Sequence, residues 1–278
     1  MNRLQMDPII HTALIEDLGA GDVTTDALAS ETEQSKVTLL VKQSGVVAGM
    51  PVAKRTFQLL DDNVIFTPLC TDGDQVEAGT PIAHISGTTR ALLSGERVAL
   101  NFMQRMSGIA SETRKIVDLV EGLGCAVLDT RKTTPGLRPF EKYAVRMGGG
   151  VNHRYGLSHG AMLKDNHIAM AGSIAEAVHR VRARNGHMVN IEVEADTLEQ
   201  VKEIVNLEVD AILLDNMDIA TLKEAVTWID GRVWTEASGG LTPETVRAVA
   251  QTGVDAISLG WLTHSAPALD ISLDWGTS

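Results

Sequence analysis

The sequence predicts an α/β protein with two parts, an irregular α+β domain followed by a barrel of parallel strands. The chain has 278 residues, which is enough to bury a core in each of two domains. In the first part, β-prone runs and helical patterns follow one another without regular order. In the second part, short β-prone runs alternate with helical patterns, which is typical of parallel strands joined by crossover helices.

The first domain is predicted to span residues 1–108. A helix is expected over residues 7–18, where apolar residues recur at helical spacing, and another over residues 51–61, which begins with a proline. The predicted strands lie within residues 36–49, as two segments around a turn, and at 64–70 and 81–87.

A long helical pattern over residues 90–122 joins the two parts. The pair Ser107-Gly108 interrupts this pattern, and the interruption places the domain boundary after residue 108. The second domain is therefore predicted over residues 109–265, and the tail from about 266 to 278 is expected to pack back on the first domain.

Six short β-prone runs define the second domain, with helical patterns between most of them. They lie at 125–130, 161–165, 189–195, 211–216, 232–237 and 256–261. This pattern favours a relative of the eight-stranded α/β barrel, although six strands are visible and not eight.

Polar groups follow most of these strands, as in Asp129-Thr130-Arg131-Lys132, Lys164-Asp165 and Asp215-Asn216. In a parallel barrel the carboxyl ends of the strands converge on one face, where active sites lie. Helix capping is the alternative. Capping accounts well for Asp215-Asn216 but poorly for Arg131, Lys132 and Lys164, because cations are disfavoured at helix amino termini.

The charge distribution points to an anionic ligand. The chain has a net charge of −12, which argues against a nucleic-acid partner, yet residues 131–167 concentrate positive charge. The cations there are Arg131, Lys132, Arg138, Lys142, Arg146, Arg154 and Lys164, against two acids, Glu141 and Asp165. Such an island indicates a small, multiply negative ligand, and a solvated basic face is the alternative reading.

The predicted site combines cations with acids. Its cationic half is Arg131, Lys132, His153, Arg154 and Lys164, and its acidic half is Glu194 and Asp215. Cations of this kind bind carboxylate or phosphate, two carboxylates can hold Mg²⁺, and the glycines of "ASGG" and "SLGW" can cradle a phosphate. The segment "MGGGVNHR" is interpreted as a mobile loop that carries His153 and Arg154 toward the pocket.

Other functions find little support. The sequence contains no HExxH or Walker A motif. Cys70 and Cys125 are expected to be buried, reduced thiols. No apolar run reaches the length of a membrane span, and the first residues lack a secretory signal, so we expect a cytoplasmic protein without a membrane partner.

Motifs along almost the whole chain resemble those of quinolinate phosphoribosyltransferase. They include "EDLGAGDVTTD", "LDTRKTTPGLR", "EKYAVRMGGGVNHRYGLSHGAMLKDNHI", "IEVEADTLEQ", "EASGG" and "SLGWLTHS", in family order. The resemblance implies an N-terminal α/β sandwich domain and an incomplete, TIM-like α/β barrel. It also implies a homodimer, the substrates quinolinate and 5-phosphoribosyl 1-diphosphate, Mg²⁺ as cofactor, and nicotinate mononucleotide, diphosphate and CO₂ as products.

The resemblance also implies roles for individual residues. Arg97 matches an arginine donated across the dimer interface, and Glu194 and Asp215 match acids that face the ribose and the metal. The residues expected around quinolinate and the phosphoribosyl group are Thr130, Arg131, Lys132, His153, Arg154 and Lys164. The expected phosphate loops are Ser238, Gly239, Gly240 and Leu259, Gly260, Trp261. Catalysis is assigned to Lys132, Glu194 and Asp215.

Two small departures and two alternatives remain. Gly240 stands where many relatives have a larger residue, and Trp261 where a small residue is common. A paralogue that uses another pyridine acid, or has a transport-associated role, is one alternative. A non-catalytic protein that binds phosphate ligands is the other, but such a protein would gain nothing from Glu194 and Asp215.

Overall fold

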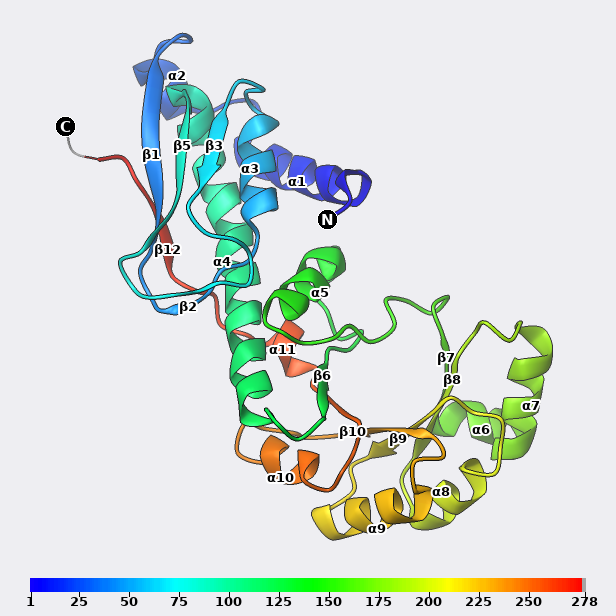
Figure 1. The fold of residues 1–278 in the computed structure, drawn as a ribbon. Coiled ribbons are helices and arrows are strands. Elements are labelled where there is room, and N and C mark those ends of the chain that lie inside the picture. The colour runs from blue at the N-terminus through cyan, green and yellow to red at the C-terminus, as the bar shows by residue number, and fades with distance from the viewer. Residues whose placement is uncertain (277–278) are drawn as a thin grey trace. The chain divides into compact units, whose positions relative to one another are not determined.

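The computed structural model describes residues 1–276 and divides them between two compact units (Figure 1). The first unit contains residues 1–114, 133–149 and the segment that begins at Trp261. The second unit contains Lys115–Lys132 and Gly150–Gly260. The chain therefore passes between the two units several times.

The first unit is built on an antiparallel sheet with the strand order β12-β1-β5-β3. These strands are β1 (Gln34–Val41), β3 (Ile65–Pro68), β5 (Pro81–Thr88) and β12 (Ile271–Asp274). A two-stranded sheet pairs β2 (Gly45–Val46) with β4 (Gln75–Val76). Alternate residues of β1, namely Val37, Leu39 and Val41, are buried, as expected for a sheet with one face on the core.

Helices complete this unit. They are α1 (Arg3–Leu18), α2 (Val23–Leu28), α3 (Met50–Gln58), α5 (Arg138–Met147), α11 (Trp261–His264) and most of α4 (Thr89–Leu119). Phe57 of α3 and Leu92 and Met103 of α4 are fully buried in one cluster with strand residues such as Leu39 and Ile85. The packing of helices on a sheet confirms the predicted α/β class for this part.

The predicted interruption of the long helix is wrong, because α4 runs without a break for 31 residues. The hydroxyl of Ser107 exchanges hydrogen bonds with Ala48, accepting from its N–H at 3.0 Å and donating to its carbonyl at 3.1 Å. A Cβ on Gly108 would lie 1.9 Å from the carbonyl oxygen of Pro267. Both residues therefore serve close packing inside a continuous helix and do not end it.

Helix α5 was not anticipated, and it splits the predicted cationic island. Lys142 of this helix is buried, and Glu141 is fully buried in an ion pair with Arg105 at 2.9 Å. Arg138 and Arg146 lie on the same helix, in the first unit, whereas Arg131, Lys132, Arg154 and Lys164 lie in the second. The seven cations therefore do not belong to one structural element.

The second unit is a six-stranded parallel sheet with the order β6-β11-β10-β9-β8-β7. All six predicted strands are present, as β6 (Ala126–Leu128), β7 (Ala161–Leu163), β8 (Ile191–Ala195), β9 (Ala211–Asp215), β10 (Trp234–Ser238) and β11 (Ala256–Ser258). Strands β6 and β7 lie at the two ends of this order. Within the described residues they do not pair with each other, as in an incomplete barrel. The predicted fold class is confirmed.

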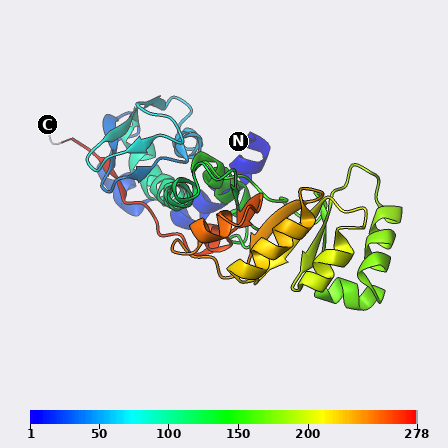
Figure 2. The same ribbon diagram turned by 60° about the horizontal axis from the view of Figure 1, so that its bottom comes forward.

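Crossover helices connect these strands and lie along one side of the sheet (Figure 2). They are α6 (Asp165–Ala171), α7 (Ile174–Arg184), α8 (Leu198–Ile204), α9 (Ile219–Ile229) and α10 (Val246–Ala250). Across residues 1–276, no helix is both long enough and apolar enough to cross a membrane.

Candidate active site

Strand register places several predicted site residues on one face of the parallel sheet. Glu194 of β8 and Glu236 of β10 both pair with Leu213 of β9, so the three lie in one row. Asp215 follows Leu213 by two residues and pairs with Ser238, so these two form the next row toward the carboxyl ends. Since side chains two residues apart point to the same face, both rows share that face.

The structure rules out helix capping for the two acids. Helix α8 is capped by the side chain of Thr197, and helix α9 by the side chain of Asp218. Glu194 instead forms a close ion pair with the ammonium group of Lys164, which follows the adjacent strand β7. Neither Glu194 nor Asp215 therefore serves as a helix cap.

Lys132 is held at the end of β6. Its backbone N–H donates to Oγ1 of Thr130 at 3.0 Å. Gly260, which follows β11, lies against its aliphatic stem, because a Cβ at Gly260 would be 2.8 Å from Cδ of Lys132. The structure thus brings Thr130, Lys132 and Gly260 together, and leaves the lysine side chain exposed.

Arg131 and Arg154 form a second cationic pair. Burial and then the charge of Arg131 lower the pKa of Arg154, while the charge of Glu192 opposes that shift. The guanidinium of Arg154 also donates to the carbonyl of Gly160 at 2.8 Å. Two neighbouring guanidinium groups repel one another, and a bound carboxylate or phosphate would relieve that repulsion.

The segment predicted to be a mobile loop is anchored. The N–H of Val151 donates to the carbonyl of Val127 at 2.8 Å, and Val151 forms a bridge with Leu128. The fully buried carboxylate of Asp129 accepts from the side chain of Asn152 at 2.6 Å and from the N–H of His153 at 2.8 Å. The loop is therefore tied to the first strand of the sheet, and a buried acid fixes the position of His153.

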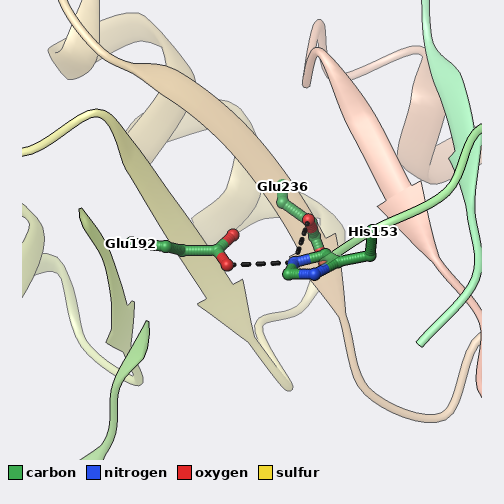
Figure 3. A group of neighbouring side chains, drawn as sticks. All are labelled: His153, Glu192 and Glu236. Atoms are coloured by element: carbon green, nitrogen blue, oxygen red, sulfur yellow. Dashed lines mark hydrogen bonds and ion pairs between the residues drawn. The ribbon is translucent and has the colours of Figure 1, made fainter. Parts of the chain in front are cut away.

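His153 points between two buried glutamates, Glu192 and Glu236 (Figure 3). Its Nε2 lies 3.0 Å from Oε2 of Glu192 and 3.4 Å from Oε2 of Glu236. The N–H of Arg154 donates to Nδ1 at 2.7 Å, so Nδ1 is the acceptor nitrogen and the proton of a neutral ring lies on Nε2.

These three residues have the donor types of a metal site, and their ligand atoms lie within 4.8 Å of one another. A metal bound through Nε2 would require that nitrogen to give up its proton. The hydrogen bond at Nδ1 holds the ring in the opposite tautomer. We therefore interpret the cluster as a hydrogen-bond network and not as a cation site.

The network changes the acidity of one member. Burial, followed by the charge of Glu192, raises the pKa of Glu236 from 4.5 to about 7. A carboxyl group whose pKa is higher in the folded state keeps its proton up to a higher pH in the folded state than in the unfolded state. The free energy of unfolding therefore falls as the pH rises from about 4.5 to about 7, by on the order of 3 kcal/mol.

We predict that Glu236→Gln removes this pH dependence, because glutamine resembles the protonated acid at every pH. Between about pH 5 and about pH 8, the free energy of unfolding of the variant should rise by roughly 2–3 kcal/mol relative to the unmodified protein. Urea unfolding across this range measures the difference. Glu224→Gln, at an exposed position of α9, is the matched control and should show no such shift. Parallel curves for Glu236→Gln and the unmodified protein would contradict the assignment.

The sequence analysis did not include Glu192, Glu236 or Asp129 in the site. A signal was available, because Glu192 and Glu194 are two residues apart in an otherwise apolar strand. Two such residues share one face of a sheet. Their contact with His153 joins distant parts of the chain and leaves no local pattern.

The remaining predicted residues are placed as follows. Arg97 is exposed on α4 and Trp261 begins α11, both in the first unit. Leu259 is buried and its N–H donates to the carbonyl of Leu128 at 3.0 Å, so that N–H is already engaged. Gly239 and Gly240 follow β10 with positive φ angles of 100° and 61°.

The sequence models of two protein domains match this chain. Residues 22–107 match the N-terminal domain of quinolinate phosphoribosyl transferase, and residues 109–274 match its C-terminal domain. The chain belongs to the quinolinate phosphoribosyltransferase family.

Members of this family from distant organisms are similar over nearly the full chain. A probable nicotinate-nucleotide pyrophosphorylase [carboxylating] of Bacillus subtilis is 47% identical, covering 99% of this chain and 94% of the relative. A quinolinate phosphoribosyltransferase [decarboxylating] 1b of Nicotiana tabacum is 42% identical, and the match covers 95% of this chain and 81% of the relative. The crystal structure of NadC from Streptococcus pyogenes has a TM-score of 0.96 at 43% identity, covering 99% and 97% of the two chains.

Proposed function

We propose that this protein transfers the phosphoribosyl group of 5-phosphoribosyl 1-diphosphate to quinolinate with loss of CO₂, which yields nicotinate mononucleotide and diphosphate for NAD biosynthesis. The observation that carries the proposal is similarity at 42–47% identity to relatives named for this activity, over almost the whole chain. The site agrees with it, because one unit carries Arg131, Lys132, Arg154 and Lys164 together with Glu194 and Asp215. Quinolinate is a dianion and its co-substrate is a polyphosphate, so both need cations.

The donor set of the two acids fits Mg²⁺. Carboxylate oxygens are the ligands that this ion prefers, and Mg²⁺ commonly binds one or two of them together with substrate phosphates. Glu194 and Asp215 supply such oxygens from neighbouring strands on one face of the sheet. When bound, the metal would supply positive charge to the diphosphate leaving group.

In the proposed mechanism the residues position two anions and stabilise a charge change. Arg131 and Arg154 bind the carboxylates of quinolinate, and Lys132 lies at the strand ends, where it neutralises the departing diphosphate. The pyridine nitrogen attacks the anomeric carbon as the diphosphate leaves, through a transition state with oxocarbenium character. The carboxylates of Glu194 and Asp215 stabilise the developing positive charge on the ribose.

Decarboxylation then follows from the charge of the product ring. The ribosylated pyridine nitrogen is positive and lies next to the carbon that carries the C2 carboxylate. The electron pair of the breaking carbon–carbon bond remains at C2, where the neighbouring cation stabilises it until a proton arrives. Little covalent catalysis is required of the protein, and positioning makes the larger contribution.

An ultraviolet assay tests this function directly. We expect quinolinate absorbance to fall only when both 5-phosphoribosyl 1-diphosphate and Mg²⁺ are present, with one CO₂ released for each quinolinate consumed. Nicotinate in place of quinolinate serves as the comparison for a paralogue that uses another pyridine acid. No donor-dependent loss of quinolinate would refute the proposal.

A further inference from the structure

Asn216 has an unusual backbone for the end of a strand. Its φ angle is 53°, and only one other non-glycine residue in the described chain, Asp230 with φ 50°, is also left-handed. Asp230 ends helix α9, where a left-handed residue is common. Asn216 directly follows strand β9 instead, so a different interaction must stabilise its conformation.

Two hydrogen bonds account for this conformation. The N–H of Asn216 donates to the carbonyl of Ser238 at 3.0 Å, which continues the pairing of β9 with β10. Its side-chain Nδ2 donates to Oδ2 of Asp215 at 2.7 Å. Neighbouring side chains in an extended strand point to opposite faces, so regular strand geometry would keep the two apart. The left-handed turn lets the amide of Asn216 reach the carboxylate before it.

Gly239 leaves the space that the Asn216 side chain occupies. A Cβ on Gly239 would lie 2.2 Å from Oδ1, 2.6 Å from Cγ and 2.9 Å from the backbone nitrogen of Asn216. A Cβ on Gly240, which is also left-handed, would have no neighbour within 4 Å. Of these two glycines, Gly239 is thus the one that the position of Asn216 requires.

We propose that Asn216 is a positioning residue that fixes the Asp215 carboxylate for a metal-bound diphosphate ligand, and that Gly239 permits this arrangement. The inference rests on the proposed function, in which Asp215 faces the ribose and the metal. The side-chain amide of Asn216 holds Oδ2 of Asp215. Within the described residues Oδ1 of Asp215 receives no hydrogen bond, so this oxygen remains to bind the ligand in a fixed orientation. Asn216 itself does not need to touch that ligand.

The first experiment replaces Asn216 by glycine, which adopts the left-handed backbone easily but lacks the amide. Calorimetry with 5-phosphoribosyl 1-diphosphate and Mg²⁺, in the absence of quinolinate, should show binding about tenfold weaker than in the unmodified protein. In turnover assays the KM for the phosphoribosyl donor should rise, while that for quinolinate stays unchanged. Thermal stability should not fall, because glycine relieves the backbone strain. Asp230→Gly makes the same backbone change elsewhere and should leave binding unaltered.

The second experiment uses Gly239→Ala, which should displace the Asn216 side chain and weaken donor binding to a similar extent. If both changes act through one contact, the double variant should bind no more weakly than either single variant. Gly239→Ala should also lower the melting temperature more than Gly240→Ala, since both positions are left-handed but only the former is crowded.

The outcomes separate the inference from the function on which it rests. Normal turnover and donor binding in Asn216→Gly, or strictly additive losses in the double variant, would overturn the positioning role and leave the function standing. No quinolinate-dependent turnover in the unmodified protein would overturn both.

Discussion

Lys132→Ala should lower kcat by about a thousandfold, because removal of one charged group that stabilises a transition state commonly costs that much. The structure shows why the fold should survive. The Lys132 side chain is exposed, and alanine would retain the hydrogen bond from the backbone N–H to Thr130 at 3.0 Å. We therefore expect an unchanged melting temperature beside an almost complete loss of turnover.

The matched control is Lys223→Ala, which removes an exposed lysine from helix α9 and should keep full activity. Quinolinate consumption and thermal unfolding are measured on the same preparations of both variants. A loss of stability in Lys132→Ala that parallels its loss of activity would assign the lysine to the fold and remove it from the site.

Mixed dimers should recover activity from two inactive parents. We propose that the protein is a homodimer in which Arg97, exposed on α4, completes the site of the partner subunit. Arg97→Ala and Lys132→Ala then damage one site from opposite subunits, and each homodimer should be almost inactive. In a mixed dimer, one site carries both changes and the other carries neither.

Refolding the two variants together at equal amounts gives about half mixed dimers, and about half of their sites are intact, so roughly a quarter of normal activity should return. Mass spectrometry of the native dimers confirms that mixing took place. If Arg97 serves its own subunit, every site keeps one change and no activity returns. Mixed dimers without recovery would therefore refute the exchange of Arg97.

The sequence predicted the parallel sheet well because its strands are short, apolar and bounded by turns. All six runs became strands, and the polar residues that follow them lie at the strand ends. Helix α5 was missed for a physical reason. Its buried Glu141 and Lys142 resemble surface charge in the sequence, and Glu141 is stabilised in the interior by pairing with Arg105, 36 positions earlier. Pairing over such a distance leaves no periodic trace.

The break assumed at Ser107-Gly108 has a similar origin. Serine and glycine commonly end helices, and local propensity alone supports that interpretation. Inside α4, Ser107 forms hydrogen bonds with the backbone of Ala48, and Gly108 leaves room for the backbone of Pro267 to lie close to the helix. The candidate site was likewise found through its charged strand ends, whereas the network of His153 with Glu192 and Glu236 depends on three segments that meet only in the folded protein.

The pairing of β12 with β1 sets an order for biosynthesis. Strand β1 lies between β5 and β12, and Leu39 and Val41 pair with Leu273 and Ile271. Until residues 271–274 have been synthesised, the antiparallel sheet has an unpaired edge at β1 that can associate with other nascent chains. The parallel sheet, whose last strand ends at Ser258, has all its strands earlier. The domain that begins first is thus the one completed last.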